Sequence, residues 1–159
     1  MKIWLSLLAV CVLLPLRTEA EMFGDLKDLA RVEENVKSKR VSSYNREGYN
    51  HDWVTIPAGA TKELFNVDGT GIITHIWITV DHSDPLSRRN LILRMYWDGE
   101  TEPSVQAPLG DFFGQGWGEF YEYATPLLAS GPSEGRSLVC YFPMPFSGKA
   151  RITRENDSE

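Results

Sequence analysis

The sequence predicts a mostly β protein, an antiparallel β-sandwich of the jelly-roll type, preceded by one amphipathic helix. From Trp53 onward, short runs rich in β-branched and aromatic residues are separated by Gly, Pro and Asp. No helical pattern of about 10 to 15 residues lies between these runs, which argues against a parallel sheet with crossover helices. The composition, 42% apolar and 11% aromatic residues, is sufficient for one hydrophobic core and excludes a disordered tail.

The first 20 residues have the features of a secretory signal peptide. Lys2 precedes an apolar run, residues 3–14, which is shorter than the roughly 18 to 20 residues that a membrane span requires. Thr18-Glu19-Ala20 is a small-x-small end. We therefore expect cleavage after Ala20, a secreted or periplasmic location, and no membrane partner for the mature chain. An uncleaved N-terminal anchor is the alternative.

Residues 21–40 are predicted to form the amphipathic helix. Apolar residues recur there at steps of three and four, acidic residues come early, and Lys and Arg come late, as the helix dipole favours. The domain proper is then expected over residues 41–159.

Within that domain, five segments have clear strand patterns: 63–67, 72–80, 90–97, 136–142 and 149–153. Alternation within 72–80 predicts that Ile72, Ile76 and Ile78 face the core, with Trp77 on the opposite side. Although Trp77 lies on the opposite face of its strand from these isoleucines, both Trp77 and Trp97 are expected to belong to the core, because tryptophans inside strands are more often buried than exposed. Asp98-Gly99 directly follows a strand and indicates a tight turn.

The charge and the rarer residues exclude several functions. A formal net charge of −6, without a run of Lys and Arg, argues against a nucleic-acid partner. The three His residues lack the spacing of a metal site, and no cofactor-binding motif is present, so neither a metal nor a cofactor is expected. Cys11 and Cys140 do not make a disulfide framework, and we expect Cys140 to be a buried structural thiol.

Two positions have the chemistry of a sugar site. Asp111 lies between glycines and two Phe rings, where a carboxylate could bind hydroxyl groups while a ring stacks on the sugar. Trp117, flanked by Gly116 and Gly118, has little local chain to bury it and is a candidate for stacking. An Asp that caps a turn beside core rings is the alternative for Asp111.

Three stretches together resemble a known family: residues 41–53, residues 96–105 and residues 110–114. They are similar to the family catalogued as domain of unknown function 2961, or glycoside hydrolase family 172. The stretches 69–77 and 143–152 agree with it, and the resemblance covers about residues 25–155.

The resemblance implies a secreted enzyme that acts on furanosides, of the fructofuranoside or arabinofuranoside type, with a retaining mechanism that uses two Glu residues. It also implies a double jelly roll and homo-oligomers built from trimers. Family members are more than twice as long, so the chain is expected to match only the N-terminal half, a truncated first roll, with the catalytic Glu pair beyond residue 159. Whether this chain is itself an enzyme is therefore open. A non-catalytic carbohydrate-binding or structural β-sandwich module is the alternative.

No residue of this chain is assigned as catalytic. The resemblance implies that two polar motifs contact the carbohydrate, and Trp117 is added from the residue pattern. The predicted substrate-binding residues are Arg46, Asn50, Asp52, Asp111, Phe112, Phe113 and Trp117. A competing hypothesis is that Arg46 and Asp52 only pair with each other and lock the loop after the helix.

Overall fold

The computed structural model describes residues 34–80 and 83–159. The predicted signal peptide and most of the predicted helix lie outside these residues. Residues 34–40 contain a turn and then no regular secondary structure, so the helix predicted over 21–40 does not extend to residue 40. Residues 41–159 form a separate unit, and the fold described below is that of this unit.

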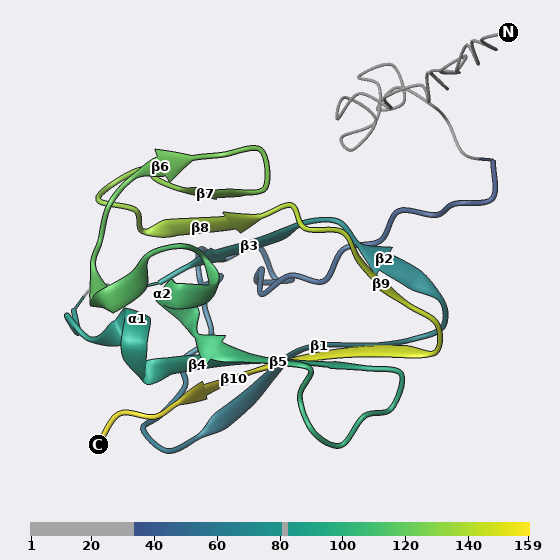
Figure 1. The fold of residues 1–159 in the computed structure, drawn as a ribbon, viewed down its shortest axis with the longest axis horizontal. Helices are drawn as coiled ribbons and strands as arrows, with labels where there is room; N and C mark the ends of the chain where they lie inside the picture. The colour runs from purple at the N-terminus through teal and green to yellow at the C-terminus, as the bar shows by residue number, and fades with distance from the viewer. Residues whose placement is uncertain (1–33, 81–82) are drawn as a thin grey trace, which may run out of the picture. The chain divides into compact units, whose positions relative to one another are not determined.

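The described residues contain two four-stranded sheets and one two-stranded sheet, all antiparallel (Figure 1). The first sheet has the order β1 (Thr61–Asp68), β10 (Lys149–Asn156), β4 (Leu91–Trp97), β5 (Val105–Pro108). The second has the order β3 (Ile76–Thr79), β8 (Ser137–Cys140), β7 (Leu128–Ser130), β6 (Tyr123–Ala124). The small sheet pairs β2 (Gly71–Ile73) with β9 (Met144–Phe146). Three short helical segments lie between the strands: α1 (Ser87–Asn90) directly precedes β4, and α2 (Leu109–Phe112) and the 3-10 segment η3 (Gly116–Gly118) follow β5.

The inner faces of the two larger sheets form one hydrophobic core. Leu93 and Met95 of β4 are fully buried, as are Leu138 and Cys140 of β8, and all four belong to one cluster with Ile152 of β10. This packing confirms the prediction of a mostly β, antiparallel sandwich, and the strand order is compatible with a jelly roll. The expected burial of Cys140 is also confirmed. Within the described ranges, no helix has the length and apolar character needed to cross a membrane.

The segment predicted as one strand over 72–80 forms two strands instead. The ladder breaks at Thr74 and His75, so that β2 pairs with β9 while β3 pairs with β8. The break reverses the alternation, because Ile73 and Ile76 both face inward although they are three positions apart, whereas an unbroken strand requires an even step. Ile72, predicted to face the core, is consequently 60% exposed.

The two strand tryptophans differ in their environment. Trp97 is half-buried and packs against the core, as predicted. Trp77 is 63% exposed on the outer face of β3, so the prediction that it belongs to the core was wrong. Its neighbours Ile76 and Ile78 take the inward positions, which leaves the outward position for Trp77.

The tight turn predicted at Asp98-Gly99 is confirmed. Both residues have positive φ, 48° and 87°, and the Glu100 N–H donates a hydrogen bond to the Trp97 carbonyl at 2.9 Å. Positive φ at both central positions is the geometry for which Asp-Gly pairs are favoured.

Candidate functional site

Asp111 lies on α2 beside a cation that the sequence reasoning did not select. Its carboxylate forms an ion pair with Arg89 of α1. Both side chains remain partly exposed, 32% for Asp111 and 46% for Arg89. The pair therefore offers hydrogen-bond donors and acceptors to solvent, or to a ligand, from a common position.

The two Phe residues after Asp111 have different environments. Phe113 is fully buried in the core cluster, and Phe112 is partly buried against it. Their rings meet edge to face with centroids 4.9 Å apart. Phe113 therefore offers no exposed ring surface in this structure, and its predicted contact with substrate stays a prediction. Phe112 stays a prediction.

Trp117 is the most exposed large apolar side chain among the described residues, at 93%. Its backbone is in the left-handed region, with φ 66° and ψ 14°. That region costs a non-glycine residue roughly 1–2 kcal/mol, and an exposed ring gains almost no packing energy in return. The fold therefore gains nothing from a tryptophan at this position, and such a feature is typical of a binding surface.

A buried polar network supports the segment that carries Asp111 and Trp117. Arg88 and Gln115 are both fully buried. The Arg88 Nε–H donates to Gln115 Oε1 at 2.8 Å, and its Nη2 donates to the Gly135 carbonyl at 3.0 Å. Gln115 Nε2 donates to the carbonyls of Tyr121, at 2.9 Å, and Gly135, at 3.0 Å. These bonds connect α1, the α2–η3 segment and the loop before β8.

Burial lowers the pKa of Arg88 to about 10. No acidic side chain in the described chain pairs with it, and its Nη1 has no hydrogen-bond partner there. Carbonyl oxygens and the Phe120 ring, whose centroid lies 5.1 Å from the guanidinium carbon, surround the charge instead. The guanidinium is still charged at neutral pH, so α1 is held to its neighbours by charge-assisted hydrogen bonds.

Close backbone packing makes the same segment rigid. A side chain at Gly110 would lie 2.6 Å from the Gln115 carbonyl oxygen and 2.8 Å from Arg88 Cβ. The Tyr121 and Tyr123 hydroxyls donate hydrogen bonds to the carbonyls of Gly114 and Phe113. These contacts therefore hold in place the backbone that carries Asp111 and Trp117.

The other predicted motif, with Arg46, Asn50 and Asp52, lies in an exposed loop. The Asn45 N–H donates to Asp52 Oδ1 at 2.6 Å, and the Ser43 hydroxyl donates to the Asp52 carbonyl at 2.6 Å. Asp52 therefore does close the loop, but through backbone groups, and in the described residues it forms no ion pair with Arg46. No hydrogen bond or ion pair found within residues 34–80 and 83–159 joins this loop to the α2–η3 segment. A common pocket for the two motifs stays a prediction.

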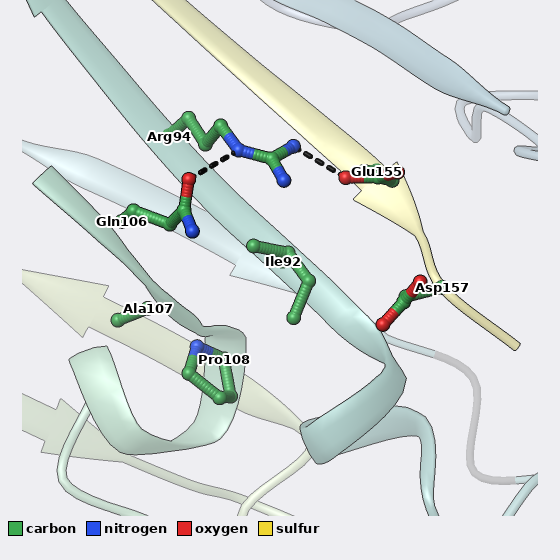
Figure 2. Close-up of a pocket in the computed structure, with 7 residues that line it drawn as sticks. All are labelled: Ile92, Arg94, Gln106, Ala107, Pro108, Glu155 and Asp157. Atoms are coloured by element: carbon green, nitrogen blue, oxygen red, sulfur yellow. Dashed lines mark hydrogen bonds and ion pairs between the residues drawn. The ribbon is translucent and has the colours of Figure 1, made fainter. Parts of the chain in front are cut away.

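Two hollows, neither lined by a predicted site residue, occur on the outer face of the β1-β10-β4-β5 sheet. The first has a volume of about 270 Å³. There Arg94 donates to Gln106 at 2.7 Å and forms an ion pair with Glu155, while Ile92 and Asp157 line the edge (Figure 2). In the alternating pattern of residues 90–97, Ile92, Arg94 and Tyr96 lie opposite the core-facing residues, and this pattern was the sequence feature that could have indicated this face.

No metal centre is apparent in the part of the chain that the structure describes, since no three His, Cys, Asp or Glu residues gather there. The residues of the α2–η3 candidate site that sequence reasoning missed are Arg88, Arg89 and Gln115. A four-residue helix has no detectable apolar period, so the two arginines could not be recognised. The Gly-Gln-Gly spacing around Gln115 was the only local signal.

The comparisons with known proteins agree with the resemblance. The profile of the GH172 domain-like family matches residues 47–159. This range includes Asn50, Asp52, Asp111 and Trp117, and it begins one residue after Arg46. A search of curated proteins gives no match. Because the matched range is most of the chain, the protein belongs to the GH172 domain-like family, which is related to the glycoside hydrolases.

Proposed function

We propose that the α2–η3 segment is the carbohydrate-binding site of an exported protein that acts on furanosides. The observation that carries this proposal is Trp117, a solvent-exposed ring held in a costly backbone conformation next to Asp111. A Cβ atom placed on Gly116 would lie 3.5 Å from Asp111 Oδ1, so the carboxylate approaches the glycine that directly precedes Trp117.

The two groups have complementary chemistry for a sugar. The indole of Trp117 offers an apolar face to the C–H side of a furanose ring. Asp111 accepts hydrogen bonds from hydroxyl groups, and Arg89 donates to hydroxyl or ring oxygens. Because the Arg88–Gln115 network already fixes the segment, ligand binding would require little further ordering, and this favours affinity.

The finer parts of the proposal follow from the family. They are a fructofuranoside or arabinofuranoside substrate and a retaining mechanism with two Glu residues. Export is proposed from the signal-peptide features of residues 1–20. No described residue is assigned as nucleophile or acid/base. A trimer-based homo-oligomer is also proposed, and the exposed apolar side chains Ile72, Trp77 and Tyr141 support it, because solvent-exposed apolar surface favours association.

A second candidate function is carbohydrate binding without turnover. One observation favours it: the proposed site contains a single carboxylate, Asp111, which is paired with Arg89. Glycosidic cleavage normally requires two carboxyl groups about 5 to 9.5 Å apart. Binding without release of reducing sugar would identify this chain as a binding module.

The test is isothermal titration calorimetry of the chain with fructofuranosyl and arabinofuranosyl oligosaccharides, with a glucopyranosyl oligosaccharide for comparison. We expect saturable binding of a furanoside, lost in Trp117→Ala. Trp77→Ala is the matched control, because it removes another exposed tryptophan from a different sheet, and its affinity should equal that of the wild type. Equal loss in both variants, or no binding of any furanoside, would refute the proposed site.

A further inference from the structure

The second hollow on the outer face of the β1-β10-β4-β5 sheet has no role in the proposed function. It has a volume of about 270 Å³ and is lined by Tyr96, Gly99, Glu100, Lys149 and Arg151. Tyr96 of β4 is the register partner of Arg151 of β10. Lys149 lies two positions before Arg151 on the same strand, so both cations share this face with Cα atoms about 7 Å apart.

Arg151 is held in place without using its hydrogen-bond donors. Its guanidinium carbon lies 3.7 Å from the centroid of the Tyr96 ring. Within the described chain, the side chain of Arg151 forms no hydrogen bond and no ion pair. A guanidinium stacked on an aromatic ring keeps the N–H groups at its edge available, and their planar geometry matches a carboxylate or phosphate.

The charges that line the hollow leave a positive excess. Glu100 is the acidic residue among the lining residues, and its carboxylate accepts hydrogen bonds from the Ser104 hydroxyl at 2.6 Å and the Trp97 N–H at 3.2 Å. Lys149 pairs with Asp68 at 3.3 Å, but the Asp68 side chain is 83% exposed. A pair so open to water contributes little and can be exchanged for a ligand.

Hydrogen bonds between the Asp98 side chain and backbone N–H groups hold together the two turns beside the hollow. Asp98 Oδ1 accepts hydrogen bonds from the N–H groups of Ser147, Gly148 and Lys149 at 2.9, 2.7 and 3.2 Å. These bonds, those from Gly148 and Lys149 first, lower the pKa of Asp98, so they are present at neutral pH. The turn after β4 and the turn before β10 therefore form one unit.

We propose that this hollow binds an anionic oxygen group, with Arg151 as a bidentate donor and Lys149 as a second cation. A neutral sugar ring is not expected to stack there, because Arg151 covers the Tyr96 ring. The shared chemistry is that of a carboxylate, as in an acidic sugar, or of a sulfate or phosphate ester. This site is separate from Trp117 and does not depend on furanoside binding.

The experiment is a nuclear magnetic resonance titration of the ¹⁵N-labelled chain with sodium glucuronate, sodium sulfate and a sugar phosphate. Glucose and sodium chloride at matched ionic strength are the comparisons. We expect saturable shifts over residues 96–100 and 149–151 with at least one anion and none with glucose. Preference for glucuronate identifies an acidic sugar, and preference for sulfate or the phosphate identifies an ester.

Variants test the assignment of the residues. Arg151→Gln should weaken binding at least tenfold, and Arg151→Lys, which keeps the charge but loses the planar fork, should give an intermediate loss. Lys62→Ala removes an exposed cation of β1 and should change nothing, as should Trp117→Gly, which separates this site from the proposed sugar site. Shifts that grow linearly with every salt, or that persist in a folded Arg151→Gln, would overturn the proposal.

Discussion

Replacing Trp117 by Gly separates a binding role from a structural role. Glycine adopts the left-handed region freely, so the substitution removes a strain of roughly 1–2 kcal/mol. The ring is 93% exposed, so less than a tenth of its surface, about 20 Å², is buried. At about 25 cal/mol per Å² this loses only about 0.5 kcal/mol. The greater freedom of glycine in the unfolded chain costs a further 0.4 to 1 kcal/mol, approximately.

These contributions nearly cancel, so the free energy of unfolding of Trp117→Gly should lie within about 1 kcal/mol of the wild type. Furanoside binding should nevertheless be lost. Urea denaturation followed by circular dichroism measures the first quantity, and calorimetry measures the second. Trp97→Ala is the contrast, because that ring packs on the core and its loss should cost about 3 kcal/mol or more. Destabilisation of Trp117→Gly by more than about 2 kcal/mol would show that Trp117 is a structural residue and would refute the reasoning.

Three further predictions concern the site and the scaffold around it. Asp111→Asn should weaken furanoside binding by roughly 1–3 kcal/mol by removing charged hydrogen bonds, yet alter the unfolding free energy by less than about 1 kcal/mol, since its ion pair with Arg89 is partly exposed; unchanged affinity in calorimetry would assign Asp111 to structure. Gly135→Ala should destabilise the chain by about 3 kcal/mol or more in urea denaturation, because φ is +72° and the new Cβ would lie 2.1 Å from Gln115 Nε2. A variant as stable as the wild type would show that the Arg88–Gln115 network can rearrange at little cost in free energy. The pKa of Asp98 is lowered in the folded state, so the stabilisation by its carboxylate is present above the unfolded-state pKa and is lost as pH falls through the folded-state pKa. Asp98→Asn should therefore lower the urea midpoint at pH 7 and have a smaller effect at about pH 2. An equal effect at both pH values would exclude a role for the charge.

The sequence was sufficient to predict the strands in which apolar and polar residues alternate regularly. Segments 63–67, 90–97 and 149–153 correspond to β1, β4 and β10, because each alternates between core and solvent along one sheet. It was insufficient where a proline or a break interrupts the pattern. β5 ends at Pro108 and β9 contains Pro145, and Pro normally argues against a strand although it is tolerated where no ladder hydrogen bond is needed.

The candidate site was predictable only in its exposed part. Glycines on both sides of Trp117 indicated that the ring would lack local packing, and the structure agrees with that exposure. Arg88 could not be found in the same way. Its role depends on the Gly135 carbonyl, 47 residues away in the chain, and a tertiary contact of this kind leaves no local pattern. The same reason explains why the full burial of Phe113 was not foreseen, since the chain after α2 directs the ring into a core built from distant strands.

The most direct test of the central claim follows the indole N–H resonance of Trp117 while a furanosyl oligosaccharide is added to the ¹⁵N-labelled chain. Our account predicts that this resonance shifts and saturates together with the backbone amides of residues 109–118, and that the indole resonance of Trp77 stays unchanged. If the furanoside binds while the Trp117 resonance remains fixed, the α2–η3 segment is not the carbohydrate-binding site.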